Sequence, residues 1–182
     1  MGTTPIGNNI WEGPIGVVRI IYDSVDYGKT TADTELIKNE DVKDITYQQD
    51  GTQYYDKVPT GISYQLQVTF GEIDTALLAK MHDSITLSGG AGNSLKVGKK
   101  LYHSWLEQAK LLEFVHIDED GDASSDPLHK AKAPKAYPEI TSNIIWGADT
   151  QRSVQITFHI FFDSTEKLFL YSGYATSLGI TP

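Results

Sequence analysis

The first residues with a spacing suited to chemistry are Gly28-Lys29-Thr30, the triplet with which a phosphate-binding loop ends. Such a loop needs another glycine ahead of the triplet, because its backbone must wrap closely around the phosphates. Asp23 occupies that position, and no glycine lies between Gly16 and Gly28. A carboxylate there would repel a triphosphate. The sequence therefore predicts an ordinary turn with a surface lysine and no nucleotide site.

A second candidate is the acidic run Asp118, Asp120 and Asp122, because carboxylate oxygens are the ligands that calcium prefers. An EF-hand loop that begins at Asp118 needs glycine at its sixth position and glutamate at its twelfth. Ala123 and His129 occupy those positions. We expect the run to be the solvated tip of a hairpin, with an adventitious divalent-cation site as the alternative.

The remaining residues that can do chemistry form no catalytic or metal-binding pattern. The chain has no cysteine and no G-x-S-x-G motif, so neither a thiol nor a serine nucleophile is indicated. No two histidines have the H-x-x-x-H spacing of a helical zinc site. We therefore expect no enzyme, no cofactor and no metal centre. The histidines are His82, His103, His116, His129 and His159.

Charge and composition limit the class of partner. The 182 residues are 40% apolar and carry a net charge of −9, which is typical of a globular and acidic chain. A protein that grips nucleic acid needs basic stripes, so this class is disfavoured. Trp11, Trp105 and Trp146 lack basic surroundings, which favours packing in the core or at an interface over stacking on bases or sugars. We expect no signal peptide and no membrane span.

The apolar pattern predicts the elements that position these residues. Residues 15–22, 42–49, 62–70 and 151–163 are rich in β-branched and aromatic types and are expected to be strands. The alternation is strictest over 62–70, where every second residue is apolar and the others are Ser, Gln or Thr. Residues 72–82 change to helical spacing and predict one short helix.

The other segments are assigned to loops or left open. Residues 26–41 and 118–138 are polar and are expected to be long excursions from the sheet, as is the loop with Pro59 and Gly61. Residues 101–117 fit a helix in their first half and a strand in their second. The sum is a mainly β single domain over residues 1–182, a β-sandwich or barrel with one short α-helix and long loops.

Residues 25–61, VDYGKTTADTELIKNEDVKDITYQQDGTQYYDKVPTG, resemble the tail tube proteins, or major tail proteins, of tailed bacteriophages. The matching pieces are Asp26-x-Gly28-x-Thr30, then DVKDI, QDGT and Lys57-x-Pro59-x-Gly61. The alternating strand and the helix EIDTALLAKM follow in the same order. QRSVQITFHIFFD is similar to the family's late strand, and LFLYSG to its closing segment. The resemblance thus includes most of the chain.

The resemblance implies a tail-tube-like structural virion protein. Such proteins form stacked rings, usually hexameric, whose sheets join into the tube through which DNA is ejected into the host. The implied partners are copies of the chain itself and the tape-measure, terminator, baseplate and sheath proteins, with DNA only as passing cargo. The implied location is the phage tail, assembled in the host cytoplasm. Ring closure would also cover exposed sheet edges, and an acidic lumen would not retain phosphates.

Two surfaces are expected to carry this function. Residues 44–61 are predicted to form a hairpin-like arm that reaches an adjacent subunit or ring. The acidic segment 118–126 and the basic segment 130–135 are predicted to lie on the periphery, available for ion pairs between subunits. The expected inter-subunit residues are Gln49, Asp50, Gln53, Tyr54, Tyr55, Asp56, Lys57, Asp118, Asp120 and Lys132. The expected lumen-facing residues are Ser63, Gln65, Gln67 and Thr69.

Two alternatives remain open at this stage. Another ring-forming tail component, such as a tail terminator or a baseplate or tube-initiator protein, would share a related β fold. A terminator would stop at one ring, whereas a tube protein would form long tubes. A carbohydrate-binding β-sandwich would instead use Trp11, Trp105 or Trp146 beside the acidic loops.

Overall fold

The main element of the chain is one antiparallel sheet of eight strands, which confirms the prediction of a mainly β fold. The structure is a computed structural model that describes residues 17–32, 34–45, 56–71, 79, 85–88, 94–97, 103–118, 120–141 and 153–173. The strand order is β2-β1-β7-β8-β9-β4-β3, and β10 pairs with β8. The strands are β1 (Val18–Tyr22), β2 (Val25–Lys29), β3 (Glu35–Ile45), β4 (Asp56–Phe70), β7 (Lys110–His116), β8 (Lys130–Ile140), β9 (Val154–Ile160) and β10 (Tyr171–Ser172).

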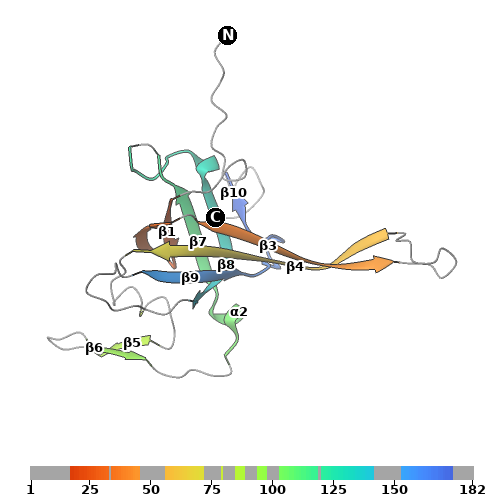
Figure 1. The fold of residues 1–182 in the computed structure, drawn as a ribbon, viewed down its shortest axis with the longest axis horizontal. Helices are drawn as coiled ribbons and strands as arrows, with labels where there is room; N and C mark the ends of the chain where they lie inside the picture. Colours follow the sequence, from red (N-terminus) through yellow and green to blue (C-terminus); the bar gives the residue numbers. More distant parts are fainter. Residues whose placement is uncertain are drawn as a thin grey trace, which may run out of the picture.

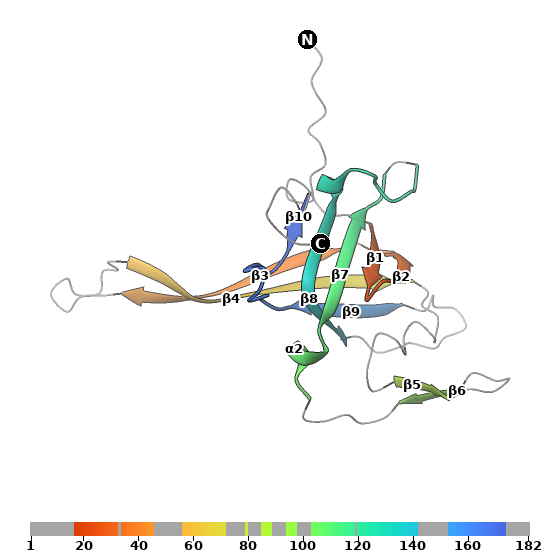
Figure 2. The same cartoon turned by 180° about the vertical axis from the view of Figure 1, so that it is seen from behind.

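Three small elements accompany this sheet. Strands β5 (Ile85–Ser88) and β6 (Ser94–Val97) form a separate hairpin, which lies apart from the main sheet in both views of the ribbon (Figures 1 and 2). Helix α2 (Trp105–Gln108) precedes β7, and the 3₁₀ turn η2 (Pro127–His129) precedes β8. None of the helices in the described residues is long and apolar enough to cross a membrane.

Strand β8 belongs to two layers of the sheet. Its first half pairs with β7, and its second half, from Ala136 onward, pairs with β9. The pairing with β7 slips by one residue between Ala133 and Ala136, a stretch that contains Pro134. Such irregularities tolerate proline and let a strand turn a corner between two layers. As a result β7 crosses β9 and β4 at a steep angle (Figure 1).

The hydrophobic core fills the space between the two layers. Tyr22 links them directly, because its hydroxyl donates to the backbone carbonyl of Ala136 at 3.2 Å. Its ring also packs against Phe158, with centroids 5.6 Å apart. The larger side chains that are fully buried come from strands of both layers and include Val18, Ile20, Leu66, Val68, Phe70, Leu112, Phe114, Ile156 and Phe158.

Strands β1 and β2 are joined by a tight two-residue turn. Asp23 and Ser24 have φ angles of 49° and 64°. Two consecutive residues in this left-handed region form the kind of turn whose twist matches that of the flanking strands. Tyr22 then pairs directly with Val25 across the hairpin.

The Gly28-Lys29-Thr30 triplet lies at the end of this hairpin and serves local structure. Gly28 has a φ of 81°, and the Lys29 ammonium donates to the backbone carbonyl of Gly121. Thr30 is buried, and its hydroxyl accepts the backbone N–H of Val18 at 3.1 Å. The lysine is at the surface, as predicted, but the triplet runs along a strand and does not form the turn.

Three segments that were expected to be loops are wholly or partly strands. The predicted excursion over 26–41 contains most of β2 and the first half of β3, and residues 56–61 begin β4. Residues 130–138 belong to β8, next to the centre of the sheet. The predictions were wrong because β3 from Lys38 to Asp44 and the start of β4 are exposed on both faces, so their apolar residues do not alternate. In β8 the buried positions are alanines between lysines, which resembles a basic surface.

The remaining elements were predicted more closely. Strand β9 keeps the expected alternation from Val154 to Ile160, but it ends before Phe162, which is exposed. Residues 101–117, left open between helix and strand, contain both α2 and β7. Of the helix expected over 72–82, only Ala79 lies within the described residues, and it is helical.

Replacing Thr30 with valine should destabilise the fold by about 1–3 kcal/mol, because the Val18 N–H would be buried without an acceptor. The exposed Thr31 is the matched control: its hydroxyl donates to the Thr69 carbonyl at 3.3 Å, where water can replace it, so Thr31→Val should cost about 0.5 kcal/mol or less. Urea unfolding followed by circular dichroism measures both values. Equal stabilities for the two variants would contradict the assigned role of Thr30.

Candidate functional site: a projecting arm and a polar sheet face

The longest exposed feature is a two-stranded ribbon in which β3 and β4 continue beyond the rest of the sheet (Figures 1 and 2). Strand β9 accompanies β4 only from Tyr64 onward, so residues 56–63 pair with β3 alone. We call residues 39–45 and 56–63 the arm. Almost all of its side chains are exposed. A ribbon of two strands is marginally stable on its own in water, so a partner that covered it would stabilise it.

The arm carries its own internal contacts. Its register shifts between Asp41 and Val42, where Thr60 is the extra residue on the other strand. The Thr60 hydroxyl donates to the backbone carbonyl of Asp41 at 3.2 Å. Nearer the tip, the Lys57 ammonium lies 3.7 Å from the Asp44 carboxylate. These contacts fix the register of the ribbon outside the body of the protein.

The arm is longer than the sequence predicted. The expected range began at residue 44 and ended at residue 61, whereas the described ribbon reaches back to 39 and on to 63. Asp56 and Lys57 lie on the arm and are exposed. The other residues expected at its tip, Gln49, Asp50, Gln53, Tyr54 and Tyr55, lie outside the described residues. Their contact with a second subunit stays a prediction.

The second candidate site is the face of β4, β9 and β8 that points away from the core and on which Tyr137 and Thr157 are nevertheless buried. Gln65 of β4 pairs with His159 of β9, which pairs with Tyr137 of β8. One step along the strands, Gln67, Thr157 and Glu139 form a parallel row. The predicted residues Ser63, Gln65, Gln67 and Thr69 do share this face, and all but Ser63 are half-buried. Whether the face lines a lumen stays a prediction.

His159 lies at the centre of the polar face. Its Nε2 lies 2.7 Å from the Glu139 carboxylate, and its Nδ1 lies 3.5 Å from the Gln65 side-chain nitrogen. The Trp105 ring packs over it with a centroid distance of 4.9 Å. His159 follows the alternation of its strand between the buried Phe158 and Ile160, but no local pattern in the sequence indicates its partners. They come from three other elements.

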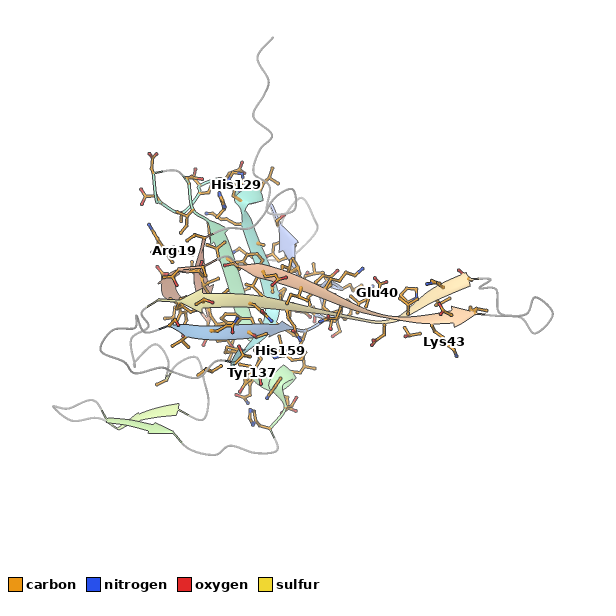
Figure 3. All side chains as sticks on the ribbon, in the orientation of Figure 1. Arg19, Glu40, Lys43, His129, Tyr137 and His159 are labelled. Carbon is orange, nitrogen blue, oxygen red and sulfur yellow. The ribbon has the colours of Figure 1, made fainter. Side chains whose placement is uncertain are left out.

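Helix α2 lies close to the labelled Tyr137 and His159 (Figure 3), and the ring of its first residue, Trp105, packs against both. The helix begins because the Ser104 hydroxyl accepts the Glu107 backbone N–H at 3.4 Å. Trp105 stacks on the Tyr137 ring, with centroids 5.2 Å apart and planes 13° apart, and remains 37% exposed. This is consistent with the expected packing role of the tryptophans. Trp11 and Trp146 lie outside the described residues.

Asp118, Asp120 and Asp122 of the acidic run are exposed, and this loop is fixed to the β1–β2 hairpin. It is closed by a backbone bond from the Asp118 N–H to the Asp122 carbonyl at 2.8 Å. Lys29 binds its Gly121 carbonyl from the hairpin. Asp118 and Asp120 are exposed, so they are accessible as predicted, and their contact with another subunit stays a prediction. No cluster of three acidic or histidine side chains that could hold a metal ion occurs in the part of the chain that the structure describes.

The basic segment does not match its predicted place. Residues 130–135 are part of β8 and are flanked by β7 and β10. The Lys132 ammonium lies 2.7 Å from the Glu113 carboxylate, and the Lys135 ammonium lies 3.4 Å from that of Asp163. Both lysines are thus paired within the chain. These residues continue a central strand instead of a peripheral excursion, and an ion pair of Lys132 with another subunit stays a prediction.

An aromatic group lies where the arm leaves the body. Tyr64 packs against Phe169 at a centroid distance of 5.2 Å, and Phe169 packs against Phe162 at 5.3 Å. The turn that holds both phenylalanines is closed by Asp163, whose backbone N–H donates to the Leu168 carbonyl at 2.8 Å. The Asp163 carboxylate accepts the Thr165 backbone N–H at 2.9 Å, and this hydrogen bond lowers the pKa of Asp163.

Comparison with known proteins gives similarities of fold at low sequence identity. No family model matches the chain, and no curated protein matches its sequence. The tube-terminating cap of the anti-feeding prophage is 15% identical, with a TM-score of 0.47, over 78% of this chain and 82% of that chain. A chain of the sheath–tube complex of an extracellular contractile injection system, PVC, is 10% identical, with a TM-score of 0.48, over 94% and 99%.

A third solved structure, Hcp1 from Flavobacterium johnsoniae, is 12% identical with a TM-score of 0.35, over 79% of this chain and 87% of that chain. All three TM-scores lie below 0.5. These likenesses therefore establish neither the family nor the function of the chain. The features of the chain that bear on its function are the arm, the edges of the sheet and the charge.

The Asp163 turn predicts a specific pH dependence of stability. Because the folded pKa lies below the ordinary value of 3.8, the carboxylate stabilises the fold fully above that value. The stabilisation is lost as the pH falls through the folded pKa. Asp163→Asn should therefore melt below the wild type at pH 7, with the difference shrinking below pH 3.8. Thermal melts at several pH values, with the exposed Asp120→Asn as control, measure this. A difference independent of pH would contradict it.

Proposed function

We propose that this chain is a structural protein that assembles with copies of itself into stacked rings, forming the tail tube of a tailed bacteriophage. The observation that carries the proposal is the arm, a long ribbon exposed on both faces that projects from a sheet with strand edges available at both ends. The sequence resemblance of residues 25–61 to tail tube proteins points to the same function. The solved structures of similar fold include a tube-terminating cap and a chain of a sheath–tube complex. Their TM-scores lie below 0.5, so the proposal does not rest on them.

The strand edges left free at the two ends of the described sheet support a head-to-tail association between copies. Strand β2 ends the sheet on one side and β3 on the other, and neither has a second strand partner among the described residues. Open edges of this kind are a hazard unless they are charged, covered or paired. If β2 of one copy lies beside β3 of the next, each contact is head to tail, and such contacts form a ring when their rotation closes.

The charge of the chain supports a conduit function over a DNA-binding one. The net charge is −9, and the polar face is dominated by amides and hydroxyls, with Glu139 paired to His159. A lumen lined with lysine and arginine would retain the phosphates of passing DNA. We propose that Ser63, Gln65, Gln67 and Thr69 face this lumen. The hexameric ring number and the partners at the ends of the tube come from the resemblance alone.

The two alternatives differ in their support. A tail terminator or a baseplate protein would use the same edges and arm, and it differs only in stopping at one ring. A carbohydrate-binding function has less support, because Trp105 already stacks on Tyr137 within the chain and so presents only part of its ring. A polysaccharide pull-down that retains the protein would revive this alternative.

Electron microscopy of the purified protein at high concentration should show rings and hollow tubes. Single rings of uniform height would favour the terminator alternative. A protein that stays dispersed as monomers under these conditions would contradict self-assembly. Sedimentation velocity on the same samples gives the fraction assembled.

Deleting residues 50–58 should abolish tube assembly while leaving a folded monomer, because the deletion removes the predicted tip of the arm and, among the described residues, only the first three of β4. Circular dichroism and thermal melting similar to those of the wild type serve as the control for folding. Tubes of normal appearance from the deletion variant would refute the assignment of the arm as a contact between subunits.

A further inference from the structure

One face of the arm is apolar along its centre. Residues directly opposite each other in an antiparallel pair project to the same face, and here Val42 lies opposite Pro59 while Ile62 lies opposite Glu40. Val42 is 49% exposed and Ile62 is 41% exposed, so both offer large apolar surface to a partner. The extra residue Thr60 brings Pro59 and Ile62 to the same side, although three positions separate them.

This face is continuous with the aromatic group at the base of the arm. Tyr64 is the next residue on the same side, and it packs against Phe169. Phe169 in turn contacts Phe162, which is 48% exposed. We call Val42, Pro59, Ile62, Tyr64, Phe162 and Phe169 the apolar face. Contiguous apolar surface of this kind marks an interaction site more often than isolated exposed residues do.

The charged side chains on this side of the arm, counted together with Lys38 directly before its first residue, cancel each other. The Lys38 ammonium lies 2.6 Å from the Glu40 carboxylate, and Lys57 lies 3.7 Å from Asp44. Two positive and two negative charges sum to zero, in a chain whose net charge is −9. The apolar face is therefore a surface on which a second acidic copy can dock without meeting net negative charge.

The opposite side of the arm differs in its net charge and, among the described residues, in its lack of a continuous aromatic group. There Val58 lies opposite Lys43, and Asp41, Asp56 and Lys43 leave an excess of one negative charge. Val58 is 40% exposed, almost the same as Ile62 on the apolar face. It has no aromatic group in continuity with it among the described contacts. The two sides therefore offer a matched comparison within one ribbon.

We propose that the apolar face is the docking surface for a second copy of this chain, and that the opposite side of the arm is not. The proposal rests on the proposed function, because it assigns one specific contact to the self-assembly stated there. Burial of Val42, Ile62 and Phe162 supplies the apolar area, and the two ion pairs form a neutral polar rim. The surface of the second copy that fits this contact is apolar and carries no net charge.

Ile62→Asp tests the proposal, with Val58→Asp as the matched control and Val42→Asp as a second test. All three positions are at least 40% exposed, so the variants should fold, as circular dichroism can verify. Ile62→Asp and Val42→Asp should each raise the protein concentration needed for assembly by about ten-fold or more, because a carboxylate would be buried in an apolar contact. Val58→Asp should assemble like the wild type. Sedimentation velocity over a concentration series measures all four proteins.

The outcomes separate this proposal from the proposed function. If the wild type assembles and both Ile62→Asp and Val42→Asp assemble equally well, the apolar face is not the contact, and the proposed function stands. If Val58→Asp is impaired as strongly as Ile62→Asp, the preference for one side is wrong. If the wild type itself stays monomeric, both the proposed function and this proposal are overturned.

Discussion

The corner in strand β8 is the constraint on which the rest of the fold depends. The described part of the sheet buries one face by folding over itself, because one strand pairs with β7 in its first half and with β9 in its second. Ala131, Ala133 and Ala136 are fully buried at the corner, where larger side chains would hold the layers apart. Tyr22 then reaches across to the Ala136 carbonyl and encloses the core between the layers.

Folding of the sheet in this way leaves two strand edges and one ribbon outside the core. Strands β2 and β3 stand at the two ends of the strand order, and β3 and β4 run past the last residue of β9. Labelled Glu40 and Lys43 lie on this outlying ribbon, well away from the core (Figure 3). The same architecture that makes the core therefore produces the surfaces to which we assign assembly. The corner in β8 therefore accounts both for the buried core and for the surfaces of the proposed assembly.

The sequence predicts those elements whose two faces differ in environment. Residues 64–70 and 154–160 alternate in burial because one side meets the core and the other does not. The arm has no such difference, so the strand character of residues 39–41 and 56–61 was not visible. The alternation of lysine and alanine at the start of β8 was visible but was taken for a charged surface. The contacts of His159 depend on three-dimensional neighbours from β4, β8 and α2, which no local pattern specifies.

The central claim is that copies of this chain complete each other's sheet edges and cover the arm. Hydrogen exchange followed by mass spectrometry, on dilute monomer and on assembled protein, tests this most directly because it reports on backbone N–H groups. The account predicts that exchange slows on assembly in β2 and along β3, while buried β7 and β9 change little. Unchanged exchange in both edge strands of an assembled sample would contradict the account.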